Sequence, residues 1–219
     1  MSLKRANLIS LGFVVATFVV IAWFWGRLPD PYPTHWNIHG EADGFTPMPW
    51  GALLLPLTQA FLWLVLVVAP WVSPRRFRLE PMRVFGSFVI LISAFFTAMT
   101  AVGVADALGR HQAVGRMLPI FIGALLMGLG NYLGKTTPNF FIGVRTPWTL
   151  ASPVVWERTH RLAAWMFVTT GLVVMVIGAL SAHASLAILL VLVPALVPAV
   201  YSYVVYRRLE GVKRDGDEA

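Results

Sequence analysis

Four side chains of metal-binding type lie close together in the first quarter of the chain: His35, His39, Glu41 and Asp43. Two histidines four residues apart share one face only where the backbone is helical. Three prolines upstream hold this chain extended, and the glycines at 40 and 44 permit turns, so a helix is not expected. We therefore predict an ordered turn in which Asp and Asn side chains bond their own backbone, and no metal.

No catalytic constellation stands out elsewhere. The chain has no cysteine, which excludes a thiol nucleophile and a cysteine zinc site, and no Ser–His–Asp arrangement is evident. We expect no catalytic residue and no cofactor. The segment 28–44 is interpreted as a recognition surface, with these candidate ligand-binding residues: Asp30, His35, Trp36, Asn37, Gly40 and Asp43.

A second polar and irregular segment, 131–161, is rich in aromatic residues, which a disordered linker would lack. Its prolines exclude a single helix, and Ser152–Pro153 is typical of a helix start. Arg145 lies in a turn, Gly143–Trp148. Its guanidinium is expected either to stack on Trp148, to clamp backbone carbonyls or to contact a ligand.

The composition shows which kind of element positions these segments. Hydrophobic residues make up 58% of the 219 residues and charged residues 12%, with a mean hydropathy of +0.72. A soluble domain has about 45–50% apolar and 25% charged residues. The net charge is +7, and the basic residues that produce it lie between apolar runs. This placement indicates membrane topology and not direct nucleic-acid binding.

Six apolar runs are long enough to cross a bilayer as helices. They are 6–26, 51–73, 84–108, 117–133, 162–182 and 186–206. The predicted fold is therefore an all-α integral membrane protein with six transmembrane helices and two long ordered loops on opposite faces. It divides into a three-helix half, 1–108, with loop 27–50, and a second, 109–219, with loop 134–161, together forming one compact membrane domain.

The distribution of Lys and Arg predicts the orientation. With cytoplasmic termini, 14 of these 17 residues lie inside, among them Arg75, Arg76 and Arg78, and only Arg27, Arg110 and Arg116 lie outside. Loop 27–50 then faces outward and loop 134–161 inward.

Few polar side chains lie within the runs. Asp106 is the one acidic residue among them, and we expect it either to reach the membrane interface or to pair with Arg110 four residues on. Hydrogen bonds between helices are expected from Thr58, Gln59, Ser93, Thr97 and Thr100. A tight connection is expected around His183 and Ser185.

The inner loop resembles the signature of the SdpI family, and outer residues 28–43 resemble the N-terminal region of unknown function commonly joined to it. The inner motif residues are Asn131, Pro138, Asn139, Gly143, Arg145, Thr146, Pro147, Trp148, Thr149, Trp156, Thr159, His160 and Arg161. The chain departs from the family in having Ala163 and Ala164 near an expected glycine, and Arg158 in place of a usual lysine.

The resemblance implies a multi-pass protein of the bacterial cytoplasmic membrane with a role in toxin immunity and signalling. Its partners would be the lipid bilayer, a secreted peptide toxin or other hydrophobic ligand outside, and a transcriptional repressor inside. Two alternatives stay open. The opposite-facing halves are compatible with a small inverted-repeat transporter, although they share no motif and we favour coincidence. The outer His and carboxylates are compatible with a membrane enzyme.

Overall fold

The computed structural model describes residues 2–72, 83–110, 113–180 and 189–217. Arg75, Arg76 and Arg78, and the connection around His183 and Ser185, lie outside the described residues. The elements in chain order are α1(Leu3–Phe24), the 3-10 turn η1(Trp25–Arg27), β1(Tyr32–Trp36), β2(Ala42–Thr46), α2(Trp50–Val72), α3(Arg83–Ala107), α4(Ala113–Leu133), α5(Pro147–Ala151), α6(Pro153–Leu180) and α7(Leu192–Asp217).

The predicted all-α membrane fold is confirmed. Within the described residues, six helices are long and apolar enough to cross a membrane, and each overlaps one of the six predicted runs. Helix α6 begins nine residues before its apolar run, and α7 continues eleven residues beyond its own. Helix α4 begins at Ala113, four residues before the predicted start, and α6 begins at Pro153, as the Ser152–Pro153 pair predicted. The first turn of α6 is bonded to Ser152, whose carbonyl accepts from Trp156 N at 2.9 Å.

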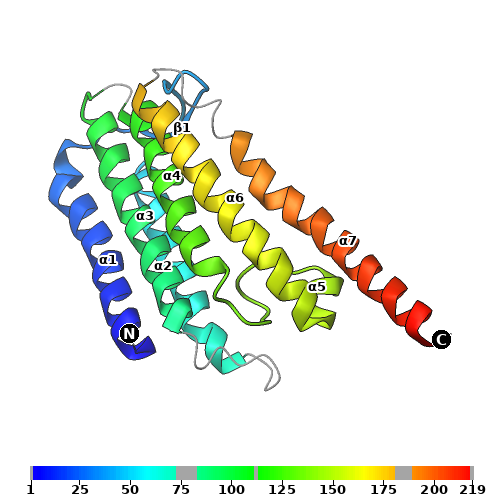
Figure 1. The fold of residues 1–219 in the computed structure, drawn as a ribbon. Helices are drawn as coiled ribbons and strands as arrows, with labels where there is room; N and C mark the ends of the chain where they lie inside the picture. The colour runs from blue at the N-terminus through cyan, green and yellow to red at the C-terminus, as the bar shows by residue number, and fades with distance from the viewer. Residues whose placement is uncertain (1, 73–82, 111–112, 181–188, 218–219) are drawn as a thin grey trace.

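The helices lie side by side as a bundle, and the two motif loops lie at its opposite ends (Figure 1). The hairpin of β1 and β2 covers one end, whereas α5 lies at the other end, where α1 begins and α7 ends. This arrangement matches the predicted separation of the two loops. Which end faces the cytoplasm remains a prediction from the Lys and Arg distribution.

Close backbone contact joins α4 to α6. A Cβ atom added at Gly123 would lie 2.5 Å from the Gly171 carbonyl oxygen, and one added at Gly171 would lie 2.6 Å from that of Gly123. Small residues at helix contacts allow this approach in membranes, where van der Waals packing drives association. Ala163 is fully buried, so the alanines in place of the family's glycine do not prevent tight packing of α6.

Polar side chains join α1, α2 and α3 within the bundle, as the sequence predicted. Gln59 Oε1 accepts from Thr17 Oγ1 at 2.7 Å, and Gln59 Nε2 donates to Ser93 O at 3.1 Å and Thr97 Oγ1 at 3.2 Å. Thr58 donates within its own helix, to Leu54 O at 2.7 Å. The bonds of Gln59 avoid the cost of an unpaired polar group in hydrocarbon. The bond expected from Thr100 is not formed, because its hydroxyl is buried without a hydrogen-bond partner.

The two halves pack differently. In the first half α1, α2 and α3 all contact one another, whereas in the second α7 packs on α6 and α5 and stands at the edge of the bundle (Figure 1). The shared order of helices and loops therefore does not extend to equivalent packing.

Candidate functional site: two motif loops at opposite ends of the bundle

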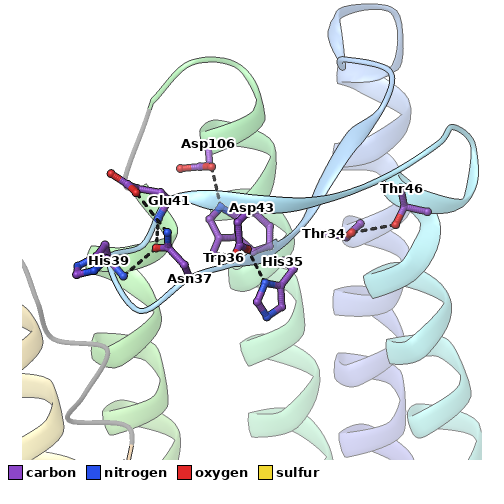
Figure 2. A network of polar contacts seen from close by, with 9 residues as sticks. All are labelled: Thr34, His35, Trp36, Asn37, His39, Glu41, Asp43, Thr46 and Asp106. Atoms are coloured by element: carbon purple, nitrogen blue, oxygen red, sulfur yellow. Dashed lines mark hydrogen bonds and ion pairs between the residues drawn. The ribbon is translucent and has the colours of Figure 1, made fainter.

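The outer segment forms an antiparallel hairpin across the helix ends (Figure 2). Strands β1 and β2 pair with Tyr32 opposite Thr46, and the hydroxyls of Thr34 and Thr46 bond at 2.9 Å. Alternating prolines favour the extended backbone of β1 because proline fixes φ and disfavours helix in the preceding residue. The sequence predicted order here but not the pairing of two strands.

Asn37 organises the hairpin turn. Its Oδ1 accepts from the backbone N–H groups of His39 at 2.8 Å and Glu41 at 3.1 Å, and its Nδ2 donates to Glu41 Oε2 at 3.2 Å (Figure 2). Gly40 completes the turn at φ +76°, a region that favours glycine. This is the predicted turn in which a side chain bonds its own backbone.

His35 and Asp43 form an ion pair across the hairpin, with Nδ1 and Oδ1 2.5 Å apart. Both side chains are largely exposed, so the pair contributes little to stability. Within the described residues, no group of three or more His, Cys, Asp or Glu side chains is placed to hold a metal ion. His35 and Asp43 are thus exposed side chains on the surface of the hairpin.

Trp36 and Asp106 fix the hairpin to the helices. Trp36 Nε1 donates to Asp106 Oδ2 at 2.9 Å, and Ala113 N, at the start of α4, donates to Asp106 Oδ1 at 3.1 Å (Figure 2). No ion pair joins Asp106 to Arg110 in the described part of the chain, so that expected pairing is wrong, and the carboxylate is bonded to the hairpin and to α4 instead. Trp36 lies 70 residues before Asp106, so the sequence did not indicate it as a partner.

The tip of the hairpin touches α4 backbone to backbone. A Cβ added at Gly40 would lie 2.5 Å from Gly115 Cα, and one at Gly115 would lie 2.7 Å from Gly40 Cα. Both positions therefore require glycine for the hairpin to lie where it does. Asp30 braces the other end, where its Oδ1 accepts from Met48 N at 3.1 Å.

A hollow of about 470 Å³ lies between the hairpin and the end of α3. Its walls combine proline rings and Phe45 with the carboxylate residues Glu41 and Asp106. Cavities of this size accommodate small ligands or a few side chains. The outer site is thus apolar with acidic groups at its margin.

Tyr32 is the buried base of the hairpin. It is 6% exposed and packs with Ile21, Ala52 and Val104. Burial, with a smaller effect from the negative charge of Asp106, raises the pKa of Tyr32 to about 12. The hydroxyl is therefore held neutral at the base of the outer site.

At the opposite end, Asn139 fixes the inner loop from within. Its side chain is fully buried. Oδ1 accepts from Phe141 N at 2.8 Å and Ile142 N at 2.7 Å, and Nδ2 donates to Thr137 O at 2.8 Å and Ile142 O at 3.2 Å. Ile142 then packs into the helix core beside Phe85. Asn139 is a scaffold residue in a loop inserted between helices.

His160 joins this loop to α6. Its Nε2 accepts from Val144 N at 3.0 Å, so Nδ1 carries the proton and donates to Trp156 O at 2.8 Å. The Trp156 ring stacks on the imidazole at 3.9 Å, and its Nε1 donates to Thr136 O at 2.9 Å. Gly143, at φ +112°, leaves room for the histidine, because a Cβ there would lie 2.1 Å from Nε2.

A capping box forms the short helix α5. The Thr146 hydroxyl accepts from Thr149 N at 3.2 Å, Thr146 N donates to Thr149 Oγ1 at 2.9 Å, and Pro147 is the first helical residue. The sequence did not predict this helix. Thr146 also contacts Ser202 Oγ of α7 at 2.9 Å, and Trp148 packs on Tyr203.

Arg145 is an exposed residue of the motif. Its Nη1 donates to Phe140 O, which is the carbonyl clamp among the predicted alternatives, and the Trp148 ring lies against Tyr203, on α7. Arg145 and Thr146 also line a hollow of about 460 Å³ between the loop and the helices. Its other walls are apolar, among them Phe88 and Phe167.

The remaining motif residues play separate roles. Asn131 lies exposed on α4, and Pro138 is half-buried at the loop entrance. Thr159 is fully buried with no hydrogen-bond partner for its hydroxyl. Arg161 is exposed and pairs with Glu157 at 2.5 Å on the same helix. The structure thus brings together the motif from Asn139 to His160 but leaves Asn131 and Arg161 at its margins.

Sequence reasoning missed the residues that receive the loops. Gly115 of α4 and Ser202 of α7 each contact a motif residue from a distant element. Neither lies in a recognisable pattern of its own. The excess of glycine in α4 was the one signal that pointed toward a close approach.

Comparison with known proteins confirms the resemblance to the SdpI family. Residues 135–202 match the SdpI/YfhL protein family, and residues 12–60 match a domain of unknown function, DUF1648. The chain is 23% identical over 209 residues to the immunity protein SdpI of Bacillus subtilis (strain 168), covering 94% of this chain and 99% of that protein. No solved structure matches.

Proposed function

We propose that this SdpI-like, multi-pass bacterial membrane protein confers immunity to a secreted toxin. The full-length similarity to an immunity protein carries the proposal. In the proposed mechanism, the outer hairpin binds a peptide toxin or another hydrophobic ligand, and the inner loop docks a cytoplasmic regulator.

The outer hairpin has the properties that such binding requires. It is fixed to α3 and α4 through Trp36, Asp106 and the Gly40–Gly115 contact, so it offers a surface that needs little further ordering on binding. The adjoining hollow combines proline and phenylalanine walls with carboxylates. This chemistry suits an apolar peptide segment that carries a positive charge.

The inner loop has the properties of a docking surface. Its backbone is fixed by Asn139 and His160, while Arg145, Arg158 and Arg161 remain exposed. A rigid loop that presents arginines favours a partner with acidic or carbonyl-rich groups. The loop is also fixed to α7, through Thr146 and Ser202.

Complementation tests the proposal. The chain would be expressed in a Bacillus subtilis strain that lacks its own SdpI and challenged with medium from the toxin-producing parent. We expect survival to rise at least tenfold over an empty vector. Unchanged survival, with the protein shown in the membrane by immunoblot, would contradict the proposal.

The alternatives have less support. The halves pack differently, which gives no pair of equivalent repeats to exchange in an alternating-access cycle. In the described part of the outer hairpin, His35 and Asp43 form an exposed pair without an oriented third group of the kind that activates a nucleophile. We therefore favour a binding protein.

A further inference from the structure

An apolar groove runs along the contact of α3 and α4, away from both motif loops. One hollow of about 590 Å³ lies near the hairpin end, and another of about 260 Å³ lies deeper along the helices. Ala98 and Phe121 line both hollows, so the two are continuous. From Ala105 to Leu91 the groove spans about 21 Å of α3 at 1.5 Å per residue.

Two arginines stand at the hairpin end of this groove. Arg110 follows α3, Arg116 lies in the first turn of α4, and both are exposed and line the larger hollow. They are two of the three Lys or Arg residues predicted on the outer side, where cations are scarce. The distribution of Lys and Arg that orients the protein in the membrane therefore does not explain why these two arginines occur together at one groove.

The neighbouring carboxylate does not neutralise them by direct contact. Both oxygens of Asp106 accept hydrogen bonds, from Trp36 Nε1 and from Ala113 N. Asp106 lines the hollow beneath the hairpin and not the arginine groove. The mouth of the groove thus offers two guanidinium groups, which bind phosphate oxygens with two parallel hydrogen bonds each.

We propose that this groove is a binding site for one anionic phospholipid, with its phosphate held by Arg110 and Arg116 and an acyl chain along α3 and α4. The groove is apolar along its length and cationic at the headgroup level only, which complements such a lipid. A purely apolar transmembrane helix is a poorer fit, because it would leave the two guanidinium groups without an anionic partner. The deep end is closed where Leu91 packs against Gly128.

Native mass spectrometry of the full-length protein tests the proposal. The protein would be purified in detergent, stripped of lipid and titrated separately with phosphatidylglycerol and phosphatidylcholine. We expect one phosphatidylglycerol to be retained at least tenfold more tightly than phosphatidylcholine. In Arg110→Gln/Arg116→Gln that preference should disappear, whereas Arg27→Gln, which removes the third outer cation outside the groove, should keep it.

A second pair of variants tests the acyl chain. Ala101→Phe fills the exposed wall of the groove and should reduce phosphatidylglycerol binding about tenfold, while Val15→Phe on the exposed face of α1 should not. Glycerol phosphate, the headgroup without chains, should compete weakly. Equal binding of both lipids, no effect of the arginine variants, full competition by glycerol phosphate, or a dimer abolished by Ala101→Phe would each overturn the proposal.

Discussion

At the scale of single residues, the inner motif is a set of mutually dependent contacts around one imidazole. His160 receives the Val144 N–H on one ring nitrogen and donates from the other to Trp156 O. Gly143 permits this because it has no side chain and adopts φ +112°. The motif residues are therefore constrained together, since a change at any of them leaves a buried polar group without its partner.

Gly143 has no space for a side chain. Gly143→Ala would place a Cβ 2.1 Å from His160 Nε2, so the loop must move and the Val144–His160 bond must break. We expect a loss of about 2–4 kcal/mol in unfolding free energy from strain and an unsatisfied N–H. Thermal unfolding in detergent measures it. Gly12→Ala, with open space around Gly12, is the control and should leave the melting temperature within a few degrees.

Arg145 differs from Gly143 because its side chain is exposed and donates to the loop carbonyl of Phe140. We expect Arg145→Ala to insert normally and to change unfolding free energy by no more than about 1 kcal/mol, yet to abolish protection in the complementation assay. Arg208→Ala, an exposed arginine on α7 outside the inner loop, is the matched control and should keep protection. Degradation of the Arg145 variant would show instead that the clamp is structural.

At the scale of elements, the hairpin depends on where the helices end. A two-stranded hairpin is marginally stable alone in water, and here its side chains and backbone are held by α3 and α4. The outer site is thus a joint product of the hairpin and the helix ends.

The Gly40–Gly115 contact gives a paired prediction. Gly40→Ala and Gly115→Ala each introduce a methyl group closer than 3 Å to the opposite backbone, and each should lift the hairpin tip. We expect both variants to increase proteolytic cleavage within 37–41 at least tenfold and to reduce protection. Gly26→Ala, which meets no atom within 4 Å, should resemble the parent. A cleavage rate unchanged in both glycine variants would contradict the contact.

Tyr32 makes the hairpin sensitive to alkaline pH. Its folded pKa of about 12 exceeds the ordinary 10.0, so the folded state keeps its proton more tightly than the unfolded chain. Stability from this group is full below pH 10 and falls as pH rises toward 12, by about 3 kcal/mol in total. Unfolding midpoints between pH 9 and 12 would show a steeper decline for the parent than for Tyr32→Phe. Parallel curves would contradict this account.

At the scale of the whole molecule, the proposed function requires the two loops to face different compartments. The structure places them at opposite ends of the bundle (Figure 1), and the excess of Lys and Arg predicts which end is cytoplasmic. Neither loop alone connects a ligand outside with a partner inside.

Cysteine labelling tests that orientation directly, because the natural chain has no cysteine. Ile38→Cys lies in the exposed hairpin and Thr137→Cys in the exposed part of the inner loop. In intact cells, a membrane-impermeant maleimide should label Ile38→Cys, and Thr137→Cys only after permeabilisation. The reverse pattern would invert the topology, and labelling of both from outside would contradict the assignment of loop roles.

Much of this architecture can be predicted from the sequence, because the sequence features that predict it are local. Runs of apolar residues specify the six helices, Ser152–Pro153 specifies the start of α6, and Asn37 specifies the hairpin turn. The polar residues Gln59 and Thr97 indicated bonds between helices, although their partner Thr17 was not foreseen. Such features depend on a few neighbouring residues or on the solvent around a helix.

The tertiary structure alone decided which distant groups meet. Asp106 has Arg110 one helical turn away, but the hairpin and α4 supply donors at both carboxylate oxygens, and these replace the local pair. The fit of Gly143 to His160 and of Gly40 to Gly115 likewise depends on how whole elements are placed. Spacing along a chain describes neighbours on one helix, whereas contacts between elements depend on the packing of all of them at once.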